Sequence, residues 1–128
     1  MNDLHIADVQ DLIGRPYVHG ARGPEAFDCW GVCAEVYRRR GVELPDYEVR
    51  HLNHAQTLAL IMGNVDDHAE WIDEPDDWAF VFDERSGHIG LHWRGSVMHA
   101  ARGLGVVVCP LRQFVQMHPR SRFARWHA

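Results

Sequence analysis

The stretch Phe27-Asp28-Cys29-Trp30-Gly31-Val32-Cys33 decides the fold, because it is typical of the start of a helix with one buried face. After Cys29, apolar or small residues recur at the three- and four-residue spacing of one helix face, at Val32, Cys33, Val36 and Tyr37. Asp28 is a suitable N-cap, since its carboxylate can accept hydrogen bonds from the unpaired amides of the first turn. Three arginines at 38–40 followed by Gly41 predict that the helix ends there.

Cys29 is predicted to occupy the first turn of this helix. The positive end of the helix dipole favours thiolate over thiol, and first-turn amides point at any charge that develops nearby. The position makes Cys29 a candidate nucleophile, the alternative being a small buried hydrophobic residue. Cys33 is assigned to core packing rather than to half of a zinc site, because no second cysteine pair lies near it. Cys109 follows three valines and is also assigned to the core.

The length, net charge and cysteine content of the chain limit the class of protein to which it can belong. At 128 residues, the chain is expected to form one domain over residues 1–128. A net charge of −5, with no basic stripe and no long apolar run, predicts neither a nucleic-acid partner nor a membrane span. The first residues lack the layout of a secretory signal, which predicts cytoplasmic synthesis. Three cysteines at irregular spacing argue against a disulfide framework.

The first half of the chain is predicted to hold helices joined by loops. Helical spacing covers residues 3–13, and three glycines and two prolines make 14–24 an irregular loop. A capping box at 53–56 predicts a short helix over 58–62, ended by the glycine that follows. Seven carboxylates within 66–77 are assigned to a solvated loop, with a metal cage as the alternative.

From residue 78 onward the sequence favours short strands, rich in aromatic and β-branched residues. A tight turn is expected at Arg94-Gly95, and a helix over 111–117. The expected strands are 78–82, 88–93, 96–100, 106–109 and 122–126. Because helices precede antiparallel strands, the predicted fold class is α+β, with N-terminal helices packed on a C-terminal antiparallel sheet of about five short strands.

A cysteine nucleophile needs a base within hydrogen-bond reach and a third group that orients the base. His88 and His99 fall on neighbouring predicted strands, and antiparallel pairing can bring such residues side by side. Gly90 leaves a space beside His88 into which a helix start could dock. The residues therefore predict Cys29 as nucleophile, His88 as base and His99 as orienter. His92 shares a strand face with His88 and is the alternative orienter.

Four motifs, in order, resemble those of the NlpC-type cell-wall cysteine peptidases, papain-like enzymes that cut peptide bonds in peptidoglycan stem peptides. They are Gly14-Arg15-Pro16-Tyr17-Val18-His19-Gly20, Phe27-Asp28-Cys29-Trp30-Gly31, Gly87-His88-Ile89-Gly90-Leu91 and Val97-Met98-His99-Ala100. The form Asp-Cys-Trp-Gly, followed by residues 37–47, is similar to the branch that phages and prophages encode and that is associated with tails.

The resemblance implies a role for each matching residue. It assigns Cys29 as nucleophile, His88 as base, His99 as the third polar residue and Tyr17 as a phenol donor near the oxyanion. No metal or organic cofactor is implied.

Three residues complete the predicted oxyanion and substrate-binding set with Tyr17, namely Asp28, Trp30 and His19. Trp30 stands where many family members have serine, and its indole is expected to narrow or reshape the cleft. His19 is expected to line the cleft or the surface rather than to take part in the chemistry.

The leading hypothesis is a cysteine endopeptidase that hydrolyses amide bonds in peptidoglycan stem peptides. Those peptides are its expected partners. The likeness to the tail-associated branch predicts phage tail proteins as further partners, and later incorporation of the chain into a tail or virion. One alternative is a catalytically silent tail-assembly protein of the same fold. Another is a Cys-His amidase or acyltransferase on a non-wall substrate, since such a site is not tied to one amide.

Overall fold

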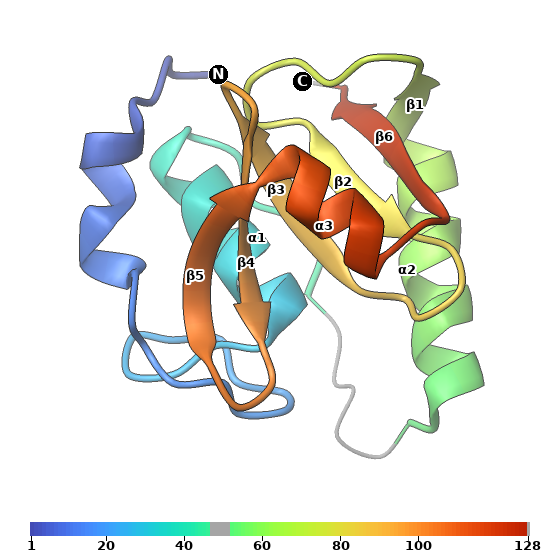
Figure 1. Ribbon diagram of the computed structural model, residues 1–128, viewed down its shortest axis with the longest axis horizontal. Helices are drawn as coiled ribbons and strands as arrows, with labels where there is room; N and C mark the ends of the chain where they lie inside the picture. Colours follow the sequence, from blue (N-terminus) through green and yellow to red (C-terminus); the bar gives the residue numbers. More distant parts are fainter. Residues whose placement is uncertain (47–51, 128) are drawn as a thin grey trace.

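The computed structural model describes residues 1–46 and 52–127. Within these ranges the chain forms a six-stranded antiparallel sheet in the order β1-β6-β2-β3-β4-β5 (Figure 1). The strands are β1 (Ala69–Ile72), β2 (Phe80–Asp83), β3 (Ile89–Trp93), β4 (Ser96–Ala101), β5 (Gly105–Pro110) and β6 (Ser121–Trp126). The helices are the 3₁₀ helix η1 (Ile6–Leu12) and the α-helices α1 (Cys29–Arg39), α2 (His54–His68) and α3 (Leu111–Met117). The predicted α+β class is confirmed, with six strands in place of about five.

Helices cover both faces of the sheet (Figure 1). On one face α1 packs on β3 and β4, and α2 packs on β1 and β6, around the larger core. On the other face α3 packs on β4 and β5, around a small core of Val81, Val97 and Phe114. Side chains alternate along β2, so Phe80 and Phe82 belong to the larger core and Val81 to the smaller one.

Aromatic side chains hold α1 against the sheet. Tyr37 stacks on Phe80 with ring centroids 5.0 Å apart, and its hydroxyl donates to the carbonyl oxygen of Trp78. Trp30 also stacks on Phe80, at 6.2 Å, and its indole N–H donates to the carbonyl oxygen of Pro45 at 2.9 Å. The expectation that Trp30 shapes the substrate cleft is wrong, because the second residue of α1 faces the sheet and is buried in the core.

The second α-helix is longer than predicted. It covers 15 residues and passes through Gly63, although the capping box between Asn53 and Gln56 forms as expected. A glycine inside a helix costs about 1 kcal/mol relative to alanine. Burial of Ile61 and Val65 in the larger core offsets that cost, so tertiary packing overrides the local stop signal.

Part of the acidic segment 66–77 is a strand rather than a loop. β1 pairs with β6 near the end of the chain, and Glu70 forms an ion pair with Arg125 opposite it at 2.6 Å. Because β6 is distant from β1 in the sequence, the local pattern does not indicate this pairing. The charges of the segment therefore suggested a solvated loop. Near the N-terminus, the helix expected over 3–13 is the shorter 3₁₀ helix η1. Within the described ranges no group of acidic, histidine or cysteine residues could hold a metal ion, and no helix is long and apolar enough to cross a membrane.

Asp28 joins the loop before α1 to the first turn of that helix. Its Oδ1 accepts from the Gly31 amide and from the Arg22 guanidinium, both at 2.7 Å, and its Oδ2 accepts from the Gly20 amide at 3.1 Å. The predicted N-cap is confirmed. The same carboxylate, only 4 % exposed, thereby fixes the chain on both sides of Cys29. Residues 37–47 carry the likeness to the tail-associated branch, and residue 47 of this segment lies outside the described residues.

Gly31 lets this loop rest directly on the helix. The Ala21 carbonyl accepts from the Asp28 amide at 3.0 Å, and a Cβ at Gly31 would lie 2.3 Å from that carbonyl oxygen. No side chain fits at this distance without a backbone shift.

Gly31→Ala should therefore lower the free energy of unfolding by about 1–3 kcal/mol, the usual cost of overpacking. Gly63→Ala is the matched control, because a Cβ there meets nothing within 4 Å and alanine favours a helix by about 1 kcal/mol over glycine. Urea unfolding of the two variants should thus shift in opposite directions. Equal stability of Gly31→Ala and the parent chain would contradict this close contact.

Candidate active site

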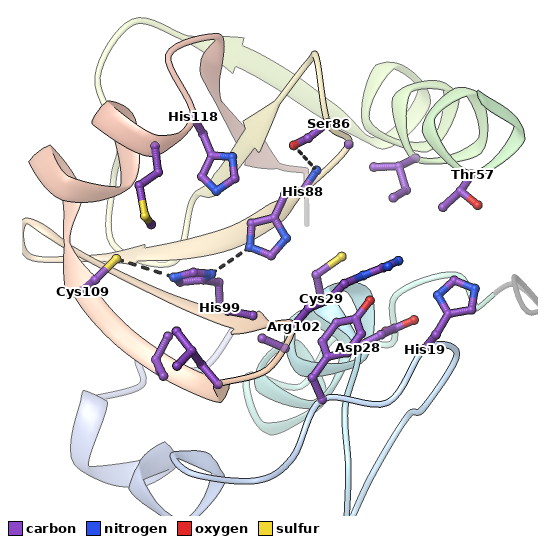
Figure 2. A pocket seen from close by; sticks show the side chains of 18 of the residues that line it. His19, Asp28, Cys29, Thr57, Ser86, His88, His99, Arg102, Cys109 and His118 are labelled. Atoms are coloured by element: carbon purple, nitrogen blue, oxygen red, sulfur yellow. Dashed lines mark hydrogen bonds between the residues drawn. The ribbon is translucent and has the colours of Figure 1, made fainter. Parts of the chain in front are cut away.

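A cavity of about 740 Å³ opens where the start of α1, the loop before it, the β2–β3 turn and the ends of α2 and α3 come together. Cys29, His88 and His99 all line it, as do Tyr17 and His19. Figure 2 shows His88 between Cys29 and His99 along the cavity wall. The structure thus brings together residues that are far apart in the sequence.

Cys29 is the first residue of α1 and lies half-buried in this wall. The backbone amides of Ile89 and Trp30 act on the Cys29 sulfur and lower the pKa of its thiol. Because Ile89 directly follows His88, this interaction places the sulfur at the strand end that carries the histidine. Among residues 1–46 and 52–127 the Cys29 amide has no acceptor, so it can donate to a bound group.

His88 and His99 share a hydrogen bond, with Nε2 of His88 and Nδ1 of His99 2.7 Å apart. The register of β3 and β4 pairs Leu91 with Met98, so Gly90 lies opposite His99 and His88 lies diagonal to it. A Cβ at Gly90 would be 3.0 Å from the Cβ of His99. The space beside Gly90 is therefore filled by β4, and not by the helix start as the sequence suggested.

His92, the alternative orienter, forms hydrogen bonds with other residues through both ring nitrogens. Its Nε2 accepts from the Gly95 amide at 2.9 Å, so its Nδ1 carries the proton and donates to the Asp76 carbonyl oxygen at 2.9 Å. The buried ring joins the β1–β2 connection to the β3–β4 turn and does not line the cavity. His99, and not His92, contacts His88.

Asp83 organises the turn that presents His88, a role that the sequence analysis missed. Its buried carboxylate accepts from the Arg85 amide at 3.1 Å, from the Ser86 hydroxyl at 2.6 Å and from Nδ1 of His118 at 3.0 Å. Ser86 Oγ in turn accepts from the His88 amide at 3.2 Å, and His118 stacks on His88 at 5.1 Å. An aspartate shortly before a serine in a turn is a signal that could have indicated part of this arrangement.

Cys109 packs against the smaller core, as its assignment to the core predicted, but it also reaches the site. Its Sγ lies 3.6 Å from Nε2 of His99, and the residue lines the cavity. If Nε2–H of His88 donates to Nδ1 of His99, the remaining proton of His99 points at the Cys109 sulfur. In that tautomer Nδ1 of His88 is unprotonated and can act as a base.

The predicted oxyanion and substrate residues lie in different places. Tyr17 and His19 line the cavity, Tyr17 half-buried and His19 exposed. Asp28 also lies at the cavity wall, but its carboxylate points to Arg22 and the helix amides, which makes it a structural residue. Trp30 does not reach the cavity.

The sequence is similar to that of a known protein family. The sequence model of the NlpC/P60 family matches residues 14–118, which include every residue of the cavity wall named above. The chain belongs to the NlpC/P60 family.

Several similar proteins are named probable endopeptidase p60. The one from Listeria grayi is 33 % identical over 104 residues, which cover 80 % of this chain and 18 % of that protein. The one from Listeria monocytogenes is 31 % identical over 103 residues, covering 79 % of this chain and 19 % of that protein. The chain thus spans about a fifth of the length of these curated relatives.

The electrostatics of the NlpC/P60 site differ from the expectation for a helix start. Burial raises the pKa of the Cys29 thiol to about 11, and the neighbouring Asp28 carboxylate acts in the same direction. The amides of Ile89 and Trp30 oppose this shift without reversing it. The predicted lowering of the thiol pKa is therefore wrong, and resting Cys29 is a neutral thiol at pH 7.

Both histidines are neutral as well. Burial lowers the pKa of His88 to about 3, with further lowering by His99 and His118. Burial also lowers the pKa of His99 to about 4, again with help from His118. A neutral imidazole is able to accept a proton from a thiol.

Alkylation of Cys29 by iodoacetamide should rise steeply with pH, because only the thiolate reacts and the thiol pKa is about 11. We expect the rate to increase about tenfold per pH unit between about pH 7 and 9, as for any thiol well below its pKa. Peptide mass mapping measures the modified fraction of Cys29 separately from Cys33 and Cys109. A rate already constant below pH 7 would instead reveal a preformed thiolate–imidazolium pair.

The buried histidine pair should also make the fold less stable in acid. The pKa values of His88 and His99, about 3 and about 4 in the fold, lie below the value of 6.5 for an unperturbed imidazole. Between these limits the unfolded chain binds more protons, so the free energy of unfolding falls as the pH drops below 6.5. Urea unfolding at neutral and acidic pH should show this fall, and a smaller one for His99→Gln. An identical pH dependence of the two proteins would exclude this origin.

Proposed function

We propose that this chain is a cysteine endopeptidase that hydrolyses amide bonds in the stem peptides of peptidoglycan. The observation that supports it most is the arrangement of Cys29, His88 and His99 in one cavity, with the two imidazoles hydrogen-bonded. Membership of the NlpC/P60 family, and relatives named probable endopeptidases, favour hydrolysis of a peptide bond. The peptidoglycan substrate follows from the likeness of the four motifs to cell-wall peptidases.

In the proposed first step, the sulfur of Cys29 forms a bond to the scissile carbonyl carbon while Nδ1 of His88 takes the thiol proton. His99 accepts a hydrogen bond from Nε2 of His88 and stabilises the imidazolium that forms. We assign the Cys29 amide and the Tyr17 hydroxyl as donors to the oxyanion. Burial raises the pKa of Tyr17, so its phenol keeps the proton that it donates.

In the second step the imidazolium of His88 gives its proton to the leaving amine as the carbon–nitrogen bond breaks. This leaves a thioester on Cys29. Water then attacks the thioester, with Nδ1 of His88 again taking a proton, and the carboxylic acid leaves as the thiol is restored. Enclosure of the histidines keeps His88 neutral between steps, which is the protonation state that both attacks require.

Cys29→Ala should abolish release of peptide fragments from purified sacculi, a loss of up to about a millionfold, since the nucleophile is removed. Cys33→Ala is the matched control, because Cys33 lies one turn further along α1, is 0 % exposed and does not line the cavity. We expect the control to keep most of the activity. Full activity of Cys29→Ala would refute the proposal.

The alternatives predict other outcomes of the same assay. A silent assembly protein would leave sacculi and soluble muropeptides intact even with every cavity residue in place. An amidase or acyltransferase with a non-wall substrate would also leave both intact, yet Cys29 would still react with an alkylating probe such as a chloromethyl ketone. Mass spectrometry of muropeptides after incubation separates these outcomes and identifies any bond that is cut.

Association with a phage tail is a further part of the proposal, and it rests on the likeness of residues 28–31 and 37–47 to the tail-associated branch. In this proposal the chain is made in the cytoplasm and joins a tail or virion during assembly. Its partners would then be tail proteins in addition to the wall.

A further inference from the structure

The cavity wall carries one uncompensated charge. Two described lining residues are formally charged at neutral pH, Asp28 and Arg102. Asp28 forms an ion pair with Arg22 at 2.7 Å, and its charge is thereby balanced. Arg102 has no carboxylate within ion-pair distance in the part of the chain that the structure describes.

Carboxylates outnumber basic side chains in this chain, with 18 acidic and 13 basic residues. Arginines on other surfaces, such as Arg39, Arg122 and Arg125, each contact a carboxylate. The remaining described arginines without such an ion pair, for example Arg112, do not line the cavity. An exposed guanidinium left free at the cavity wall can bind an anion that enters from solvent.

The place of Arg102 relates it to the reacting atoms. It follows β4 directly, three positions after His99, and its guanidinium carbon lies 5.7 Å from the centre of the Tyr17 ring. The Arg102 guanidinium opposes the rise in the Tyr17 pKa that burial causes, and its charge lowers the pKa of His88. Arg102 therefore lies on the same side of the cavity as the proposed oxyanion donor.

The shape and charge of the guanidinium favour a carboxylate as the ligand. Its planar fork of N–H donors matches a carboxylate, which it binds through two parallel hydrogen bonds. The other described residues that line the cavity are neutral apart from Asp28, and several, including Leu104, Val107 and Met117, are apolar. The Asp28 carboxylate is paired with Arg22.

We propose that Arg102 is a specificity-determining residue that binds a carboxylate of the substrate close to the amide that Cys29 attacks. The inference rests on the proposed function, because stem peptides combine amide bonds with free carboxylates. A peptide whose carboxylates are converted to amides would lose this contact while keeping the scissile bond.

The test compares two synthetic stem tetrapeptides, one with free carboxylates and one with the same groups amidated. For the parent enzyme we expect kcat/KM to be about 10- to 100-fold higher for the free peptide, as for hydrogen bonds to a charged group. Arg102→Gln should bring this ratio close to one, and Arg102→Lys should leave an intermediate ratio because a lysine keeps the charge without the fork. Arg112→Gln, the control on exposed α3 surface, should keep the parent ratio.

A positioning role through Tyr17 alone makes a different prediction. In that case Arg102→Gln would lower kcat for both peptides equally, and the ratio would stay at the parent value. That result would overturn the carboxylate site.

Binding to the Cys29→Ala variant separates this inference from the proposed function. Calorimetry with the free peptide should show a Kd about 10- to 100-fold weaker when Arg102→Gln is added. Such a loss, without cleavage by the parent enzyme, would support the Arg102 site and remove the peptidase proposal. Equal binding with cleavage by the parent enzyme would overturn the Arg102 site alone, and no binding together with no cleavage would overturn both.

Discussion

The hydrogen bond between His88 and His99 is the constraint on which the site depends. It forms in a wall where burial keeps both imidazoles neutral, since charging either one would cost solvation. Two neutral rings can only pair a donor with an acceptor, so the direction of this bond decides which nitrogen of His88 is basic. The pairing of β3 with β4 supplies the distance, and Phe114 of α3, 5.0 Å from the His99 ring and 5.8 Å from the His88 ring, supplies part of the enclosure.

Two buried carboxylates fix two of the segments that line the cavity. Asp28 ties the preceding loop to the start of α1, and Asp83 ties the β2–β3 turn to His118. Each is costly to bury alone, but each is satisfied by several donors, so it rigidifies the chain around it. The proposed nucleophile and base therefore belong to separate elements whose ends are both fixed. The relative position of sulfur and imidazole follows from packing between these elements rather than from any flexible side chain.

The state of the thiol shows which of two opposing effects is larger. A helix dipole is worth about 0.3–1 kcal/mol at a terminus, which is less than one pKa unit. Burial together with the Asp28 charge moves the Cys29 pKa from 9.0 to about 11. The effect of burial on the thiol pKa is therefore larger than that of the dipole. Asp28, which caps the helix, also raises this pKa and so opposes the dipole. Activation of Cys29 in the proposed reaction therefore belongs to His88 at the moment of attack.

The sequence by itself determined the α+β class, the α1 helix with its Asp28 cap, the α3 helix and the Arg94-Gly95 turn, because each depends on residues close together in the chain. It also indicated Cys29, His88 and His99, since strand alternation and motif order are local patterns. Only the tertiary structure decided that Trp30 belongs to the core, that β1 pairs with β6, and that Asp83, His118, Cys109 and Arg102 surround the site. These depend on contacts between distant segments and on burial, which no local spacing encodes.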